Sequence, residues 1–164
     1  MERTLRAFAH VNNGGYEFAP KQKHPVLTHQ NPADPASAVH DRSVEPDGLL
    51  MRNFLPAISF EAKYTASTSL PERAHMFQAL TTAAALGTSL AVLVYPGDEP
   101  PRIYDVRGFM GAPRHLATIG LSMFTYSRPG GDIDRAGQIA ALLDEVARRG
   151  GPAHIGTLQG VVSH

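Results

Sequence analysis

The clearest hydrophobic pattern in the chain begins at Ile58, where apolar and polar residues alternate. Ile58, Phe60, Ala62 and Tyr64 occupy every second position, and polar or charged residues lie between them. A period of two is typical of a strand with one buried face. We therefore predict a half-buried strand over residues 58–64.

The segment after this strand has the period of an amphipathic helix. Apolar residues recur every three or four positions over residues 70–84, which places them on one helical face. Ser69 and Glu72 have the spacing of a capping box, and Gly87 lies where a helix C-cap is expected. We predict a helix over residues 70–86.

Further strands and a second helix are predicted toward the C-terminus. The apolar run from Leu90 to Tyr95 is typical of a strand covered on both faces. A helical stripe of apolar residues runs from Ala136 to Val146, and Asp132 precedes it as a cap candidate. Together the patterns predict strands over residues 89–95, 102–109 and 115–127 and a helix over residues 132–149.

Residues 1–57 have a different pattern, because prolines interrupt them repeatedly. Each proline removes a backbone donor and restricts the residue before it, so no helix of useful length is expected. The turn sequence at residues 12–15 lies between short apolar groups and predicts a small hairpin. Residues 21–47 lack periodicity and predict an extended arm. The prolines are Pro20, Pro25, Pro32, Pro35, Pro46 and Pro56.

These elements predict an α+β fold: an antiparallel β-sandwich-like sheet flanked by two helices, with a long extended N-terminal arm. Residues 1–57 form the Pro/His-rich arm, residues 58–149 form a β-α-β-β-β-α core domain, and residues 150–164 form a C-terminal tail or edge strand. A chain of 164 residues has room for one domain of ordinary size.

The charge balance and the absence of cysteine exclude several classes of function. Fifteen basic residues balance fifteen acidic ones, whereas proteins that bind nucleic acid through phosphate contacts need a basic surplus. Sequence-specific nucleic-acid binding is therefore not expected. Without cysteine there is no disulfide, thiolate zinc site or cysteine nucleophile.

Nothing in the sequence predicts a membrane segment or export. The longest apolar run, from Leu90 to Tyr95, is far shorter than the roughly 20 residues that span a bilayer. The first residues are basic, but no apolar stretch of signal-peptide length follows them. We predict synthesis in the cytoplasm and no membrane partner.

Histidines in the predicted arm are the only candidate metal ligands. His29, His40 and Asp41, with His24 nearby, carry the imidazole and carboxylate groups that suit transition metals. Their spacing is irregular, and solvated histidines in a loop explain the same residues. We therefore predict neither a metal nor a cofactor, and keep His29, His40 and Asp41 as the candidate set.

The sequence shows no catalytic constellation, and we predict that the chain is not an enzyme. Residues 120–124 contain a serine but lack the second glycine of a nucleophile elbow. Residues 129–132 precede a predicted helix but lack the Gly-Lys-Ser/Thr of a phosphate-binding loop. The carboxylates fall in turns and on polar faces, so no acid–base pair can be identified.

One enzyme family is nevertheless similar in part. Residues 64–68, 71–77 and 102–106 resemble the strand, helix and strand in the middle of small ADP-ribosyltransferases. That resemblance implies a small enzyme or toxin that uses NAD. The nicotinamide-binding histidine strand and the catalytic glutamate motif of that family have no counterpart in this sequence.

A second resemblance covers residues 58–127. The alternating strand at 58–64, the helix that ends at 85–88, the segments at 93–96 and 104–109, and the strand at 119–126 resemble, in order, domains of long-tailed bacteriophage tails. These are the tail-tube and distal-tail proteins and the N-terminal domain of phage DNA-circularisation proteins. The resemblance implies a β-sandwich that assembles into hexameric rings, with no catalytic residue.

The arm favours the same interpretation. Residues 1–57 bury too little apolar surface to offset the entropy of ordering, so we expect a partner subunit to order them by strand addition or in a groove. We predict a structural virion protein of a tailed phage or related particle: a homo-oligomeric tail, baseplate or connector component.

Its partners would be copies of itself and neighbouring virion proteins. A capsid-decorating or minor capsid protein is the alternative, and a non-viral protein would be cytoplasmic. The expected subunit-contact residues are Phe8, Tyr16, Phe18, Val26, Leu27, Leu49, Leu50, Phe124 and Tyr126.

Overall fold

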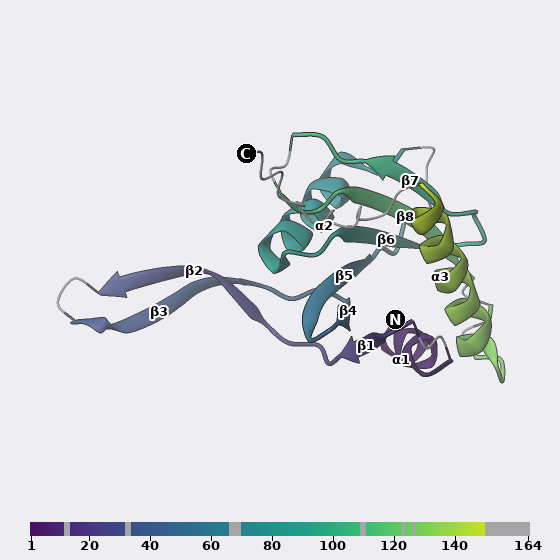
Figure 1. Ribbon diagram of the computed structural model, residues 1–164, viewed down its shortest axis with the longest axis horizontal. Coiled ribbons are helices and arrows are strands. Elements are labelled where there is room, and N and C mark those ends of the chain that lie inside the picture. Colours follow the sequence, from purple (N-terminus) through teal and green to yellow (C-terminus); the bar gives the residue numbers. More distant parts are fainter. Residues whose placement is uncertain are drawn as a thin grey trace, which may run out of the picture.

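The protein is described from a computed structural model. The structure describes residues 1–11, 14–31, 34–65, 70–108, 111–122, 124–125 and 127–149. They form a three-layer α+β body and a long two-stranded hairpin that projects from it (Figure 1).

The centre of the body is a six-stranded mixed sheet. Its strand order is β1-β4-β5-β6-β8-β7. The neighbours β5, β6 and β8 run parallel, whereas β1, β4 and β7 pair antiparallel with their neighbours. The strands are β1 (Tyr16–Ala19), β4 (Gly48–Arg52), β5 (Leu55–Ala62), β6 (Leu90–Pro96), β7 (Arg102–Asp105) and β8 (His115–Leu121).

Three helices cover the two faces of this sheet. Helices α1 (Glu2–Val11) and α3 (Gly131–Arg148) contact each other on one face, and α2 (Arg73–Leu86) covers the other. Strand β6 is buried on both faces, as its apolar sequence predicts: Val92 contributes to the core under α1 and α3, and Leu93 to the core under α2.

The hairpin consists of β2 (His24–Asn31) and β3 (Asp34–Val44), which pair antiparallel as a separate sheet. In Figure 1 they leave the body beside β1 and β4 and extend away from the helices as a twisted ribbon. None of the described strands of the body pairs with this ribbon.

The α+β class is confirmed, but the antiparallel sandwich is wrong. The structure has one mixed sheet with helices on both faces. Strands β5 and β6 are joined through α2, and a helical crossover brings two consecutive strands together in parallel. The alternation of residues 58–64 predicts a strand but contains no information about the direction of its neighbours.

The extended N-terminal arm is also wrong, because residues 2–11 form α1 and β1 and β4 belong to the main sheet. No proline precedes Pro20, so the first segment is free to form a helix. Leu5 and Phe8 of α1 are fully buried in the core. Gly48 permits this close approach, since a Cβ there would collide with the Leu5 side chain. The boundary at residue 57 therefore falls inside β5.

The predicted small hairpin around residues 12–15 is replaced by the junction between α1 and β1, because the residues before it are helical. The capping box is wrong as well: Glu72 is itself the N-cap of α2 and makes no side-chain cap hydrogen bond. Ser69 lies outside the described residues, as do residues 150–164.

The core elements after residue 58 are confirmed in order. The predicted strand, helix, three strands and helix correspond to β5, α2, β6, β7, β8 and α3, with β7 and β8 shorter than expected. Gly87 caps α2 with φ 70°, and its N–H donates to the carbonyl of Ala84. A left-handed C-cap of this kind is the usual role of glycine at a helix end.

Candidate functional site

The hairpin is a two-stranded sheet that pairs with none of the described strands of the body. Its antiparallel pairing runs from His24–Val44 at its base to Asn31–Asp34 near its tip, with register shifts along the way. A two-stranded ribbon has two outer edges, and a ribbon of this kind is at best marginally stable alone in water. Near the base, the side chains of Val26 and Leu27 are exposed. The ribbon therefore offers both strand edges and apolar side chains for contact.

The base of the hairpin is fixed to the body by Asp47. Its Oδ2 accepts a hydrogen bond from the backbone N–H of Ala62 at 2.9 Å, and its Oδ1 lies 3.4 Å from Lys21 Nζ. Lys21 also lies 3.8 Å from Glu45, and these carboxylates, Asp47 first, raise its pKa above the ordinary lysine value. Both connections between hairpin and body thus meet at one charged cluster beside the end of β5.

A cavity of about 480 Å³ lies at this base, and we call it the root cavity. Its wall includes the carboxyl ends of β5, β6 and β8, which is where open α/β sheets commonly bind ligands. Its size falls in the usual range for binding pockets. Lining residues come from four regions: Met1, Glu2 and Thr4 of the N-terminal segment; Phe18–Gln22, His24, and Pro46–Leu49 around the hairpin base; Ala62–Tyr64, Val94–Pro96, Leu121 and Ser122 at the strand ends; and Arg135 of α3.

Arg135 joins two helices at the wall of the root cavity. It is only 3% exposed; its Nε donates to Thr4 Oγ1 of α1 at 3.0 Å, and it forms an ion pair with Asp132. Asp132 also pairs with Arg3 at 2.9 Å. The guanidinium charge is therefore compensated within the protein, and its role at this wall is to hold α1 against α3.

A second hollow of about 400 Å³ separates the hairpin base from α2, and Glu61 lies in its wall. The Glu61 side chain is buried, and its Oε2 accepts a hydrogen bond from Gln78 Nε2 at 3.2 Å. Burial first, and then the negative charge of Asp47, raise the pKa of Glu61 above the ordinary value of 4.5, against an opposing effect of Lys63.

We expect Glu61→Gln to stabilise the protein at neutral pH. A raised pKa means that the fold favours the protonated carboxyl, so its stabilisation is present below pH 4.5 and is lost as the pH rises through the raised pKa. Glutamine is neutral throughout. The melting temperature of the variant should therefore equal that of the wild type near pH 4 and exceed it increasingly toward pH 7.

Glu145→Gln is the control for this titration. Its hydrogen bond to Arg149 lowers the pKa of Glu145, so its stabilising effect is present above its ordinary pKa and is lost as the pH falls. The Glu145→Gln variant should therefore have a lower melting temperature than the wild type at neutral pH. A Glu61 variant less stable than the wild type at pH 7 would contradict the proposed cost of the buried carboxylate.

A carboxylate–imidazole–hydroxyl chain lies between α2 and β6. Tyr95 Oη is 3.5 Å from His75 Nδ1, and His75 Nε2 is 3.5 Å from Glu72. Burial raises the pKa of Tyr95, so its phenol stays protonated at neutral pH. The chain therefore extends from the exposed Glu72 through His75 to the buried Tyr95 hydroxyl.

The predicted subunit-contact residues divide into three groups. Phe8, Leu49 and Leu50 are buried in the core of their own chain, and Tyr16 and Phe18 pack partly buried against that core. Val26, Leu27 and Phe124 are exposed, as a contact surface requires. Tyr126 lies outside the described residues.

The candidate metal residues lie in the hairpin: His29 in β2, and His40 and Asp41 in β3. In the backbone register, Thr28 pairs with His40 and His29 pairs with Val39. The side chains of His29, His40 and Asp41 lie outside the part of the chain that the structure describes, so this candidate set stays a prediction. Among the side chains that are described, no group of three or more His, Asp or Glu is arranged to hold a metal ion. Within the same residues, no helix has the length and apolar character of a membrane span.

The turn between β4 and β5 is a surface feature that we did not predict. Asn53 and Phe54 both have positive φ, 52° and 63°, in a two-residue connection that usually takes Asn-Gly. Phe54 is 86% exposed and Leu55 is 67% exposed. The available signal was the Asn between two apolar segments, which is a turn cue even without the glycine.

Comparison with known proteins gives a likeness in fold. Neither protein-family models nor curated protein sequences match the chain. A solved structure described as a half-complex from a tetradecameric assembly of Thermococcus gammatolerans McrB AAA+ hexamers with bound McrC contains a chain of similar fold. The TM-score is 0.54 at 13% identity, over 84% of this chain and 31% of that one. The fold and site thus define an α+β domain with a projecting hairpin, and it spans about a third of the chain it resembles.

Proposed function

We propose that this chain is a structural subunit of a protein assembly, and that the β2–β3 hairpin is the arm by which it binds other copies of itself. The observation that carries the proposal is the hairpin, which forms a sheet separate from the body (Figure 1). None of the side chains of the ribbon that the structure describes belongs to the core of the body.

Strand addition or groove binding is the contact that suits this ribbon. Its outer edges present backbone donors and acceptors that another strand can pair with, and main-chain pairing of this kind gives affinity without sequence-specific pockets. The exposed Val26 and Leu27 add apolar area at its base. Since the chain has no net charge, many copies can pack closely without mutual repulsion.

The similar fold in the McrB–McrC structure supports a role in assembly. That chain belongs to a tetradecameric complex, so a fold of this type occurs in a large multi-subunit particle. A virion tail component would also be a structural subunit of a protein assembly, so that prediction is one case of the present proposal. In place of the predicted extended arm, the proposal assigns the contact to an ordered hairpin that projects from a mixed sheet.

Shortening the hairpin tests the proposal. Replacing residues 26–42 by Asn-Gly keeps the register pairs His24–Val44 and Pro25–Ser43 and closes them with a favoured two-residue turn. Light scattering on the full-length protein should give a multiple of 17.6 kDa, and the shortened variant should be a monomer with an unchanged thermal transition.

A second variant keeps the hairpin and removes its apolar surface. Val26→Thr with Leu27→Thr preserves β-propensity and should weaken the assembly without shortening the arm. A full-length protein that stays monomeric at high concentration, or a shortened variant that assembles as well as the wild type, would refute the proposal.

A further inference from the structure

The β4–β5 turn, residues 52–55, has an unfavourable backbone and an exposed aromatic side chain at its apex. We call it the Phe54 turn. Left-handed φ values are costly for residues with a Cβ, and more so for a bulky side chain than for asparagine. Phe54 is nevertheless at φ 63° and 86% exposed. The body of the protein gains little packing from this residue in return.

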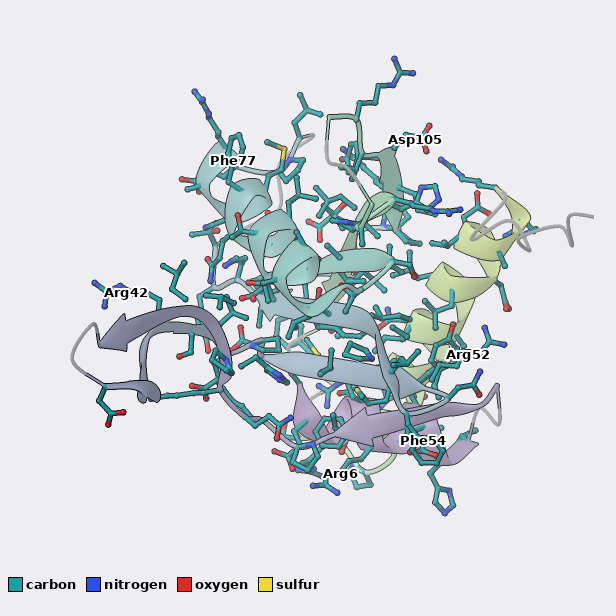
Figure 2. The ribbon with its side chains drawn as sticks, turned by 60° about the vertical axis from the view of Figure 1, so that its left-hand side comes forward. Arg6, Arg42, Arg52, Phe54, Phe77 and Asp105 are labelled. Atoms are coloured by element: carbon teal, nitrogen blue, oxygen red, sulfur yellow. The ribbon has the colours of Figure 1, made fainter. Side chains whose placement is uncertain are left out.

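Strain combined with exposure indicates a contact outside the chain. Strained positions are retained where they have a function, and large aromatic residues concentrate at the centres of protein interfaces. Leu55, which follows directly, is also exposed. Figure 2 labels Arg52 and Phe54 at the same end of the sheet, so a basic residue flanks the apolar apex.

The root cavity lies at the other end of the same strand. Strand β5 starts at Leu55 in the turn and ends at Ala62 in the cavity wall, which corresponds to a separation of about 23 Å along the strand. The cavity wall contains Phe18, Leu49 and Leu121, and its volume of about 480 Å³ exceeds what the side chains of a phenylalanine and a leucine occupy.

We propose that the Phe54 turn of one copy inserts into the root cavity of the next. The inference rests on the proposed function, and it names a second contact between the same subunits. Turn and cavity lie at opposite ends of one strand, so the contact is head-to-tail and repeats into a ring or a filament.

The position of the cavity favours a second copy as its occupant. The hairpin leaves the body at the cavity wall, so a subunit held by the hairpin is already next to the cavity. The turn then adds apolar burial to a contact that the hairpin begins. In this arrangement the hairpin and the root cavity of one subunit form one continuous interface for the next subunit.

Cysteine cross-linking tests the contact directly, because the wild-type chain has no cysteine. Leu55→Cys marks the turn and keeps Phe54, whereas Ser122→Cys marks the cavity. Under an added oxidant, a mixture of the two single variants should form a disulfide-linked dimer, and neither variant alone should do so. Ser122→Cys mixed with Ala141→Cys, on the exposed side of α3, is the control and should remain uncross-linked.

The turn itself is tested by Phe54→Gly. Glycine adopts positive φ without strain, so the variant should melt a few degrees higher than the wild type while its oligomer dissociates at least tenfold more readily. Asn53→Gly is the matched control, since it relaxes the same turn, keeps Phe54 and should leave the assembly unchanged.

The outcomes separate this inference from the proposed function. A wild type that is monomeric by light scattering refutes both. A wild-type oligomer that depends on the hairpin but is unaffected by Phe54→Gly, or that shows no turn-to-cavity disulfide, refutes the insertion alone. A disulfide dimer of Leu55→Cys with itself also refutes it, because that product requires turn-to-turn contact.

Discussion

A protein truncated to begin at Leu55 is expected to be unfolded. The truncation removes α1, β1 and β4, which supply Leu5, Phe8 and Leu50 to the core. Their loss would expose Ile58 and Phe60 of β5 to water and leave β5 as an unprotected edge strand. Burial of large apolar side chains contributes about 2 kcal/mol each, so the loss over these five residues is comparable with the whole stability of an ordinary domain.

Thermal unfolding followed by circular dichroism is the measurement for this truncation. We expect no cooperative transition, whereas the variant with Asn-Gly in place of residues 26–42 should melt near the wild-type temperature. The two variants together distinguish the parts of the N-terminal third: α1, β1 and β4 belong to the core, and the hairpin does not. A cooperative transition in the truncated protein would instead support the separate arm that the proline content predicted.

The elements after residue 58 could be predicted because each has a local pattern. β5 alternates, α2 and α3 have helical stripes, and β6 is apolar throughout because both of its faces are covered. Gly87 adopts the left-handed conformation that its position suggested. In these segments the pattern of apolar and polar residues within a short window reflects which positions are buried, so one sequence is sufficient to predict the type of element.

The N-terminal elements could not be predicted for a different reason. Helix α1 buries only Thr4, Leu5 and Phe8, too few positions to establish a period, and its stability comes from contact with α3 far along the chain. The hairpin forms a sheet apart from the body, and Pro25 and Pro35 are tolerated there because a two-stranded ribbon leaves strand edges unpaired. The prolines predict an extended arm, whereas Pro25 and Pro35 lie in the strands of a hairpin.

The candidate site shows the same division. Val26 and Leu27 are contact candidates because they are apolar residues in a polar segment, and their side chains are exposed in the structure. Asp47 and Arg135 were missed, since their importance depends on partners that only the fold brings near: Ala62 for Asp47, and Thr4 for Arg135. Tertiary contacts of this kind leave no spacing in the sequence.

Arg135→Met is expected to destabilise the protein by about 2–3 kcal/mol, because a buried charge-assisted hydrogen bond to Thr4 is lost and Asp132 keeps its pairing with the exposed Arg3 but loses its buried partner. Methionine retains an unbranched side chain that can fill the space of the arginine stem, so the loss reports the guanidinium. Thr4 Oγ1 would lose the donor recorded at 3.0 Å, and Asp132 would lose its buried partner. Chemical denaturation gives the free energy of unfolding.

Arg3→Met is the matched control, because Arg3 pairs with the same carboxylate from the surface. Its side chain is 71% exposed, and exposed ion pairs contribute about 0–1 kcal/mol. Equal losses in the two variants would show that Asp132, not the buried guanidinium, limits stability here. A larger loss of unfolding free energy for Arg135→Met would establish that the buried guanidinium holds α1 against α3. A ligand or subunit in the root cavity would then contact a wall formed by two helices that are distant in sequence.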